Sequence, residues 1–132
     1  IGEFKSYGNG RLLTILTYGN GLYLSLQAQK DIEKKLGKKI KIIDLMWISD
    51  VNYETLLKEI SPCKTILIVD ECRRSGCHGE GILANLILKS KKPLNIALHA
   101  AEDSFISIGN AATATLPSKD SIVQNALNLV NA

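Results

Sequence analysis

The residues of this chain that could carry chemistry are concentrated in residues 64–82, KTILIVDECRRSGCHGEGI. In this stretch an apolar run is followed by the carboxylates of Asp70 and Glu71 and by the guanidinium groups of Arg73 and Arg74. Open α/β sheets place the groups that face ligands and partners at the carboxyl ends of their strands. We therefore expect Asp70 and Glu71 to lie at the carboxyl end of a strand, and Arg73 and Arg74 to lie on the functional loop that follows it.

Three glycines follow the arginines, Gly76, Gly79 and Gly81. Glycine permits positive φ and close backbone approach, and the amides of a glycine-rich turn at a helix start can bind an anion or a carboxylate. Tight packing of the loop against the helix would require the same glycines. The sequence leaves both interpretations open, with tight packing somewhat favoured for any single glycine.

Cysteine and histidine side chains in this region suggest metal binding or nucleophilic catalysis, and both fit poorly. Cys72, Cys77 and His78 have no C-x-x-C spacing, and Cys63 and His99 lie elsewhere in the sequence. A Cys–His nucleophile pair between adjacent residues also fails, since neighbouring side chains rarely point at each other. We predict no metal site, no catalytic residue and three free thiols, as expected in a reducing compartment.

A second glycine motif, Gly19-Asn20-Gly21, begins like a dinucleotide-binding fingerprint. Leu24 occupies the position of the third glycine, so a tight turn between a strand and a helix is favoured over nucleotide binding. The chain contains no phosphate-binding P-loop, no Gly-x-Ser-x-Gly and no H-E-x-x-H. Catalysis by this chain alone is not expected.

The elements that position these residues alternate between strands and helices. Apolar, β-branched runs bounded by turn residues predict strands at 3–7, 11–18, 39–45, 65–69 and 94–98. Helical spacing of apolar residues predicts helices at 20–36, 52–60, 79–89 and from 118 onward, with Asn20, Asn52 and Ser118 as N-caps. This alternation predicts an α/β fold with three layers, a mostly parallel sheet covered by helices on both faces.

Composition limits the organisation and the partners. The chain has 132 residues, of which 45% are hydrophobic, and this is enough for one core and one domain spanning residues 1–132. Its formal net charge is +3, and its lysine clusters contain no interleaved aromatic residues, so we expect no nucleic-acid partner. No secretory or membrane-spanning segment is visible, which favours a cytoplasmic location, or the mitochondrial matrix in a eukaryote.

Three segments together carry a resemblance to a known family. These are TYGNGLYLSLQAQKDIEKKLGKKIKIIDLMWISDVNYETL, then ILIVDECRRSGCHGEGI, then AEDSFISIGNAATATLPSKDSIVQNAL. In this order they resemble the C-terminal domain of the transketolase superfamily, and are most similar to the beta chain of thiamine-diphosphate-dependent 2-oxo acid dehydrogenases. Matching positions are Asp70, Glu71, Arg74, Ser75, Gly76, Gly79 and Ile82, whereas Cys77 replaces a usual glycine and Glu80-Gly81 differs from the commoner order.

The resemblance implies a fold and a role. It implies a five-stranded sheet with one antiparallel edge strand, which we assign to residues 3–7. It also implies a part of a longer enzyme that decarboxylates pyruvate or a branched-chain 2-oxo acid. Thiamine diphosphate and magnesium would be bound by other domains, because the family's Gly-Asp-Gly motif is absent here. This domain would instead contact other subunits of a dimer or α2β2 enzyme and help dock a dihydrolipoyl acyltransferase.

Residues outside the regular elements are the further interface candidates. Trp47 lies in an apolar connector, and Phe105 lies in the long segment 100–117, a length typical of functional or interface loops. The residues predicted to contact a partner are therefore Trp47 and Phe105 together with Asp70, Glu71, Arg73, Arg74, Gly76 and Gly79. Packing of both aromatic residues under neighbouring helices remains open.

Other functional interpretations of the chain are a transketolase or deoxyxylulose-phosphate synthase domain, or a free-standing module that binds an anion or a protein.

Overall fold

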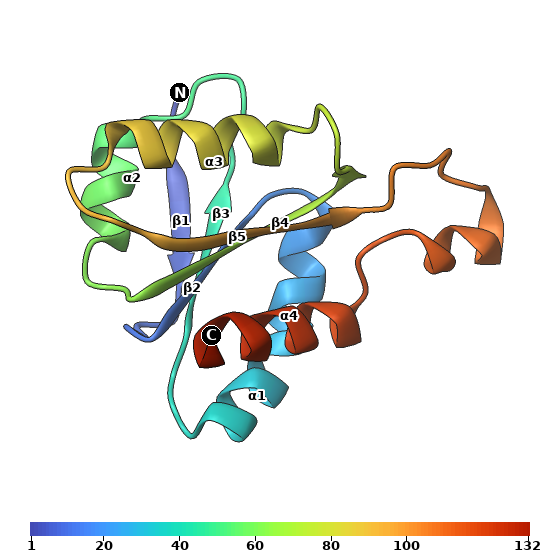
Figure 1. Cartoon of the computed structure of the whole chain (residues 1–132), viewed down its shortest axis with the longest axis horizontal. Helices are drawn as coiled ribbons and strands as arrows, with labels where there is room; N and C mark the ends of the chain where they lie inside the picture. Colours follow the sequence, from blue (N-terminus) through green and yellow to red (C-terminus); the bar gives the residue numbers. More distant parts are fainter.

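The computed structural model describes residues 1–132 as a five-stranded sheet between two layers of helices (Figure 1). The strand order in the sheet is β1-β3-β2-β4-β5. The strands are β1 (Phe4–Tyr7), β2 (Leu13–Thr17), β3 (Lys41–Leu45), β4 (Thr65–Arg73) and β5 (Asn95–Ala101).

Strand direction confirms the predicted topology. β2 is parallel to β3 and β4, and β4 is parallel to β5. β1 pairs only with β3 and is antiparallel to it, which places the antiparallel strand at an edge as expected. β4 lies inside the sheet between β2 and β5, and residues Thr65–Asp70 are buried because helices cover both faces.

The structure also has four α-helices and one 3₁₀ helix. They are α1 (Asn20–Leu36), α2 (Tyr53–Ile60), α3 (His78–Lys89), η1 (Gly109–Ala114) and α4 (Lys119–Asn131), of which η1 and α4 follow the last strand. α1 and α4 pack against one face of the sheet and α2 and α3 against the other. Each face has its own apolar core, so the sheet separates two clusters of buried side chains.

Capping explains where three of the helices begin. The Asn52 side chain accepts a hydrogen bond from the Thr55 amide, and the Ser118 side chain accepts one from Ser121, as the sequence predicted. The N-cap of α1 is Gly19 rather than Asn20, which is the first helical residue. Gly19 has φ 55°, a conformation that favours glycine over asparagine at this turn.

Two sequence predictions about the elements are wrong in detail. β4 continues to Arg73, so Arg73 belongs to the strand and not to the loop, and the register between β4 and β5 shifts after Val69. Ile87, predicted to face the core from α3, is 52% exposed. Helical spacing marks a candidate apolar side, but the position of the neighbouring strands decides which residues are covered.

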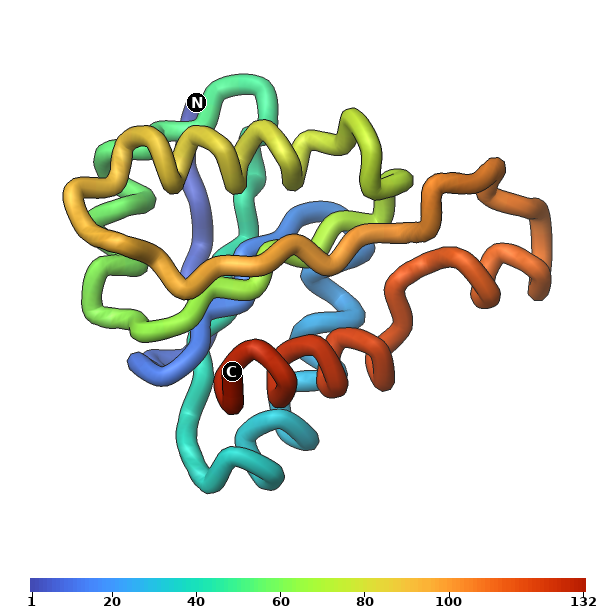
Figure 2. Tube along the Cα trace, viewed as in Figure 1, coloured from blue at the N-terminus to red at the C-terminus, as the bar shows by residue number.

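The chain between β5 and α4 forms an arm that extends away from the sheet and returns to it (Figure 2). Residues 102–111 of this arm are all exposed. Residues 104–118 contain no charged side chain. None of the helices in the structure has both the length and the apolar character needed to cross a membrane.

Candidate functional site

Asp70 is the buried centre of the candidate site. Asp70 is 1% exposed and lies where β4 passes the start of α3. Oδ1 accepts a hydrogen bond from the Cys72 amide at 2.9 Å, and Oδ2 accepts one from the Gly79 amide at 2.9 Å. A carboxylate at the N-terminus of a helix is also stabilised by the helix dipole. Through these two hydrogen bonds Asp70 links the end of β4 to the start of α3.

Two further amides, those of Ser75 and Gly76, also donate to carboxylates of this chain. The Ser75 amide donates to Asp103 Oδ1 at 2.7 Å, and the Ser75 hydroxyl donates to Oδ2 of the same residue at 2.6 Å. The Gly76 amide donates to Glu80 Oε2 at 2.6 Å. The donors that the sequence suggested for a bound anion are therefore occupied by Asp70, Asp103 and Glu80. This arrangement favours the tight-packing interpretation of the loop.

Gly79 and Gly76 are each required as glycine, for different structural reasons. A Cβ atom on Gly79 would lie 2.6 Å from Leu98 Cδ1 and 3.1 Å from Asp70 Oδ2, so the helix start packs too closely on β4 and β5 for a side chain. Gly76 has φ 80° with open space around it, so it is required for its backbone conformation rather than for packing.

The Tyr18 side chain and two backbone amides near the Asp70 carboxylate change its electrostatics. Burial by itself raises the pKa of Asp70, but the nearby Tyr18 hydroxyl and the Cys72 and Gly79 amides outweigh burial and lower it. The Tyr18 hydroxyl is buried, yet no hydrogen bond to it has acceptable geometry, so we attribute the low pKa mainly to the two amides. Asp70 is therefore charged at neutral pH.

The cysteine thiols beside Asp70 are held in their protonated form. Burial, followed by the charge of Asp70, raises the pKa of Cys72. Burial and Asp70 also raise the pKa of Cys77. Because the thiolate is the reactive form, neither cysteine is activated as a nucleophile. Cys63 lies apart at the start of β4, where its sulfur accepts a hydrogen bond from Thr14 Oγ1 at 2.8 Å.

All three cysteines are free, and Cys72 is the only exposed one. We expect thiol titration of the folded chain to detect Cys72 first, at a rate below that of a free cysteine, and titration after unfolding without reductant to detect three thiols. The reason is that only accessible thiolate reacts, and unfolding exposes Cys63 and Cys77. Fewer than three thiols in the unfolded chain, or one equivalent of zinc by metal analysis, would contradict the prediction.

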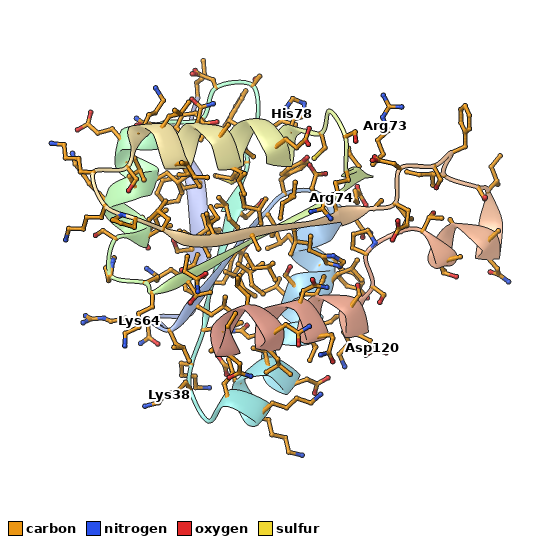
Figure 3. All side chains as sticks on the ribbon, viewed as in Figure 1. Lys38, Lys64, Arg73, Arg74, His78 and Asp120 are labelled. Atoms are coloured by element: carbon orange, nitrogen blue, oxygen red, sulfur yellow. The ribbon has the colours of Figure 1, made fainter.

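The two arginines are available for contacts. The structure has ion pairs at Lys39–Glu33, Lys41–Glu59, Lys58–Glu54 and Lys119–Asp31, and neither Arg73 nor Arg74 is in any of them. Both arginine residues are exposed. Figure 3 shows Arg73 projecting outward between His78 and the base of the arm. Arginine is enriched at protein interfaces, so this position suits contact with a partner.

Phe105 lies near Arg73 and is 100% exposed. A shallow surface pocket of about 430 Å³ joins the loop to the arm, and its lining includes Cys72, Arg73, Gly76, Cys77, His78, Ser104, Phe105 and Ile106. Ile108, further along the arm, is 98% exposed. A large aromatic and an aliphatic side chain in solvent, next to unpaired arginines, are typical of a surface that a partner covers.

Trp47 lies apart from this pocket. It follows β3 and is 45% exposed, and its neighbour Met46 is 49% exposed. The connector after β3 and the arm after β5 are separated in Figures 1 and 2, because β2 and β4 lie between β3 and β5 in the sheet. Glu71 is half-buried, with Oε1 near the turn at Gly19. The predicted contact residues therefore form a cluster at the loop and the arm, with Trp47 outside it.

Sequence reasoning missed four residues of the site. Asp103 and Tyr18 are distant in sequence from the loop, and no local motif marks their contacts with it. Glu80, in the first turn of α3, has a recognisable signal, because acidic residues are favoured there. His99 is half-buried, and its Nε2 lies 2.8 Å from Ser121 Oγ on α4. Burial, and then the nearby Arg74, lower the pKa of His99.

The fold, the fastened strand–loop–helix and the exposed arm define a three-layer α/β domain of the transketolase type. The family model described as "Transketolase, C-terminal domain" matches residues 2–119, and the chain belongs to this family. Similar relatives are the pyruvate dehydrogenase E1 component subunit beta of Staphylococcus epidermidis, 28% identical, and that of Staphylococcus aureus, 26% identical. Each alignment has 130 residues and covers 96% of this chain and 39% of the relative.

A solved structure described as "Split gene transketolase, inactive beta4 tetramer" has the same fold. Its TM-score is 0.80 at 19% identity, and the match covers 97% of this chain and 43% of that chain. The chain thus spans about two fifths of the length of the proteins that it matches.

Proposed function

We propose that this chain is the C-terminal domain of the beta chain of a thiamine-diphosphate-dependent 2-oxo acid dehydrogenase, where it builds contacts between subunits. The similarity to two pyruvate dehydrogenase E1 beta subunits supports the class of enzyme. The role at an interface is supported by the loop and arm. There Phe105 is exposed beside Arg73, which has no ion pair, and Ile108 is exposed further along the arm.

The observation that carries this proposal is the occupation of the loop amides. Cys72, Ser75, Gly76 and Gly79 all donate to carboxylates of the same chain, so the loop has the rigid form of a structural support. A free-standing module that binds a small anion would need some of these donors for its ligand. A transketolase or deoxyxylulose-phosphate synthase domain is the second possibility within the superfamily, and the named relatives favour it less.

Thiamine diphosphate and magnesium belong, in this proposal, to other parts of the full enzyme. The residues here do not fit either group. No cluster of three or more His, Cys, Asp or Glu side chains could hold a metal ion, and the loop amides that could face a diphosphate are already donors to Asp70, Asp103 and Glu80. The chain also has no Gly-Asp-Gly sequence.

The proposed reaction of the full enzyme is the oxidative decarboxylation of pyruvate or a branched-chain 2-oxo acid. The acyl group would pass to a dihydrolipoyl acyltransferase, and this domain would help to dock that partner through the exposed loop and arm. Arg73 and Phe105 are the candidates for that contact, because arginine and aromatic residues dominate binding energy at interfaces.

Calorimetry of the 132-residue chain with thiamine diphosphate and magnesium tests the assignment of the cofactor. We expect no heat of binding and no decarboxylation of pyruvate by this chain alone, and we expect the full-length subunit with its partner chains to show both. The physical reason is that the Ser75, Gly76 and Gly79 amides, which could face a diphosphate, already donate to carboxylates of this chain. Micromolar binding to the chain would mean that the cofactor site has been misplaced.

A further inference from the structure

Basic residues gather at the edge of the domain where the parallel strands begin. β2, β3, β4 and β5 are parallel, so their first residues lie side by side. The segments that lead into these strands carry five exposed cationic residues, which we call the basic edge: Arg11, Lys38, Lys64, Lys91 and Lys92. These residues come from four separate parts of the sequence, and the fold brings them together.

Backbone contacts hold the four segments next to one another. The Lys64 amide donates to the Arg11 carbonyl at 3.2 Å, and the Gly10 amide donates to the Ile40 carbonyl at 3.3 Å. The start of β5 pairs with the start of β4. Neighbouring strands are about 4.8 Å apart, so the basic edge crosses four strands over about 15 Å.

Ion pairs within the chain do not neutralise the basic edge. None of its five residues belongs to the ion pairs of the structure. Glu33 and Glu59, which lie near the start of β3, already bind Lys39 and Lys41. Acidic residues gather instead where the strands end, at Asp44, Asp70, Glu71, Glu102 and Asp103. The two edges of the sheet therefore differ in charge.

Helix dipoles do not account for the basic edge. Lysines in the last turn of a helix are stabilised by its dipole, and Lys34, Lys35 and Lys89 are in this position. The five residues of the basic edge lie outside the helices, and the dipole effect falls off within the last turn. Like charges on neighbouring strands lie within the Debye length of about 8 Å and repel one another. An anionic partner would relieve this repulsion.

The residue types at the basic edge select the class of partner. Four of the five cations are lysines, which are mobile point charges and suit carboxylates without a fixed geometry. Nucleic-acid bases stack on aromatic side chains, and membrane-surface segments insert apolar ones. None of the exposed large apolar residues lies within 10–12, 37–40, 61–64 or 90–93. An acidic segment of a protein needs only the cations, so it fits best.

We propose that the basic edge binds an extended acidic segment of a partner protein, whose carboxylates lie against Lys38, Lys64 and the Lys91-Lys92 pair. Alternate side chains of an extended chain are about 7 Å apart, so three carboxylates span the edge. The proposal goes beyond the function proposed above, because the loop and the arm lie at the other end of the strands. Figure 3 shows Lys38 and Lys64 on the side of the sheet away from Arg73.

Fluorescence anisotropy with a labelled peptide tests the contact. The probe is a peptide of about eight residues in which glutamate alternates with serine, and the control probe has glutamine in place of glutamate. We expect the chain to bind the glutamate peptide and not the glutamine peptide. The dissociation constant should rise at least about tenfold when NaCl is raised from about 50 to about 200 mM, because salt screens exposed charges.

Substitutions locate the binding surface. Lys64→Gln should raise the dissociation constant about threefold, and Lys38→Gln together with Lys64→Gln about tenfold, because each removes an exposed charge contact. Lys5→Gln is the matched control, since Lys5 is exposed, has no ion pair and pairs with Asp44 near the other end of the strands. It should change the dissociation constant by less than about 1.5-fold.

Competition experiments separate the classes of partner. We expect the unlabelled glutamate peptide to displace the probe at a lower concentration than an oligothymidylate of equal charge does. The reverse order would overturn the proposal and make the edge a nucleic-acid surface. Sedimentation of the chain with phosphatidylserine vesicles in excess glutamate peptide would overturn it in favour of a membrane surface. Equal binding of the two peptides, or equal effects of Lys64→Gln and Lys5→Gln, would also overturn it.

Discussion

Replacement of Asp70 by alanine is expected to lower the free energy of unfolding by about 3 kcal/mol, since two buried amides lose a charged acceptor. The amides of Cys72 and Gly79 would have no partner, and water has little access to a residue that is 1% exposed. Urea denaturation of the variant and of the original chain measures the difference. The loss should also loosen the start of α3, which Asp70 fastens to β4.

Asp103→Ala is the matched control. Asp103 also accepts two hydrogen bonds, from the amide and the hydroxyl of Ser75, but its residue is exposed and water can replace it. We expect this variant to lose less than about 1 kcal/mol. Asp70→Asn should be intermediate, because its amide group can accept at one position only. Equal losses of unfolding free energy in the two alanine variants would show that the burial of Asp70 adds nothing to the strength of its hydrogen bonds.

The same prediction has a pH dependence. Because the folded-state pKa of Asp70 is lowered, the carboxylate contributes stability above its unfolded pKa of about 3.9, and this contribution is lost as the pH falls through the folded value. The Asp70→Ala chain should therefore lose less stability than the original chain when the pH is lowered below about 4. Urea denaturation at a series of acidic pH values provides the comparison.

Phe105→Glu is expected to weaken assembly of the full-length enzyme by about thirtyfold while changing the stability of the isolated chain by less than about 0.5 kcal/mol. Phe105 is 100% exposed, so the folded domain gains almost nothing from its ring. A partner that covers the ring would instead meet a buried charge. Assembly is measured by titrating the full-length beta chain against its partner chains, and stability by urea denaturation.

Trp47→Glu should lower the stability of the isolated chain more than Phe105→Glu does. Trp47 is 45% exposed, so part of its ring is packed in the domain, and we expect a stability loss of about 1 kcal/mol in addition to weaker assembly. Leu88→Glu is the control for both, as an exposed apolar residue outside the loop and the arm. If either aromatic substitution lowers the free energy of unfolding of the domain by more than it weakens the free energy of assembly, that residue belongs to the core. Its assignment to the interface would then be wrong.

Much of the fold could be predicted from local patterns. The continuous apolar run 65–69 identified a strand buried on both faces, and Asn52 and Ser118 identified two helix starts through their side-chain acceptors. These signals are reliable because they depend on groups within a few residues of each other. The antiparallel direction of β1 came from family resemblance, since a short strand has no local mark of its pairing direction.

The sequence by itself determined that this is an α/β chain with a strand–loop–helix segment that is rich in carboxylates, arginines and glycines. Only the tertiary structure decided what those groups do. It placed Asp70 against Gly79 and Asp103 against Ser75, and thereby occupied the donors that had suggested an anion site. It also left Phe105 in solvent. Contacts across 9 and 28 residues depend on how the loops meet after the sheet has formed, and residue spacing does not encode that geometry.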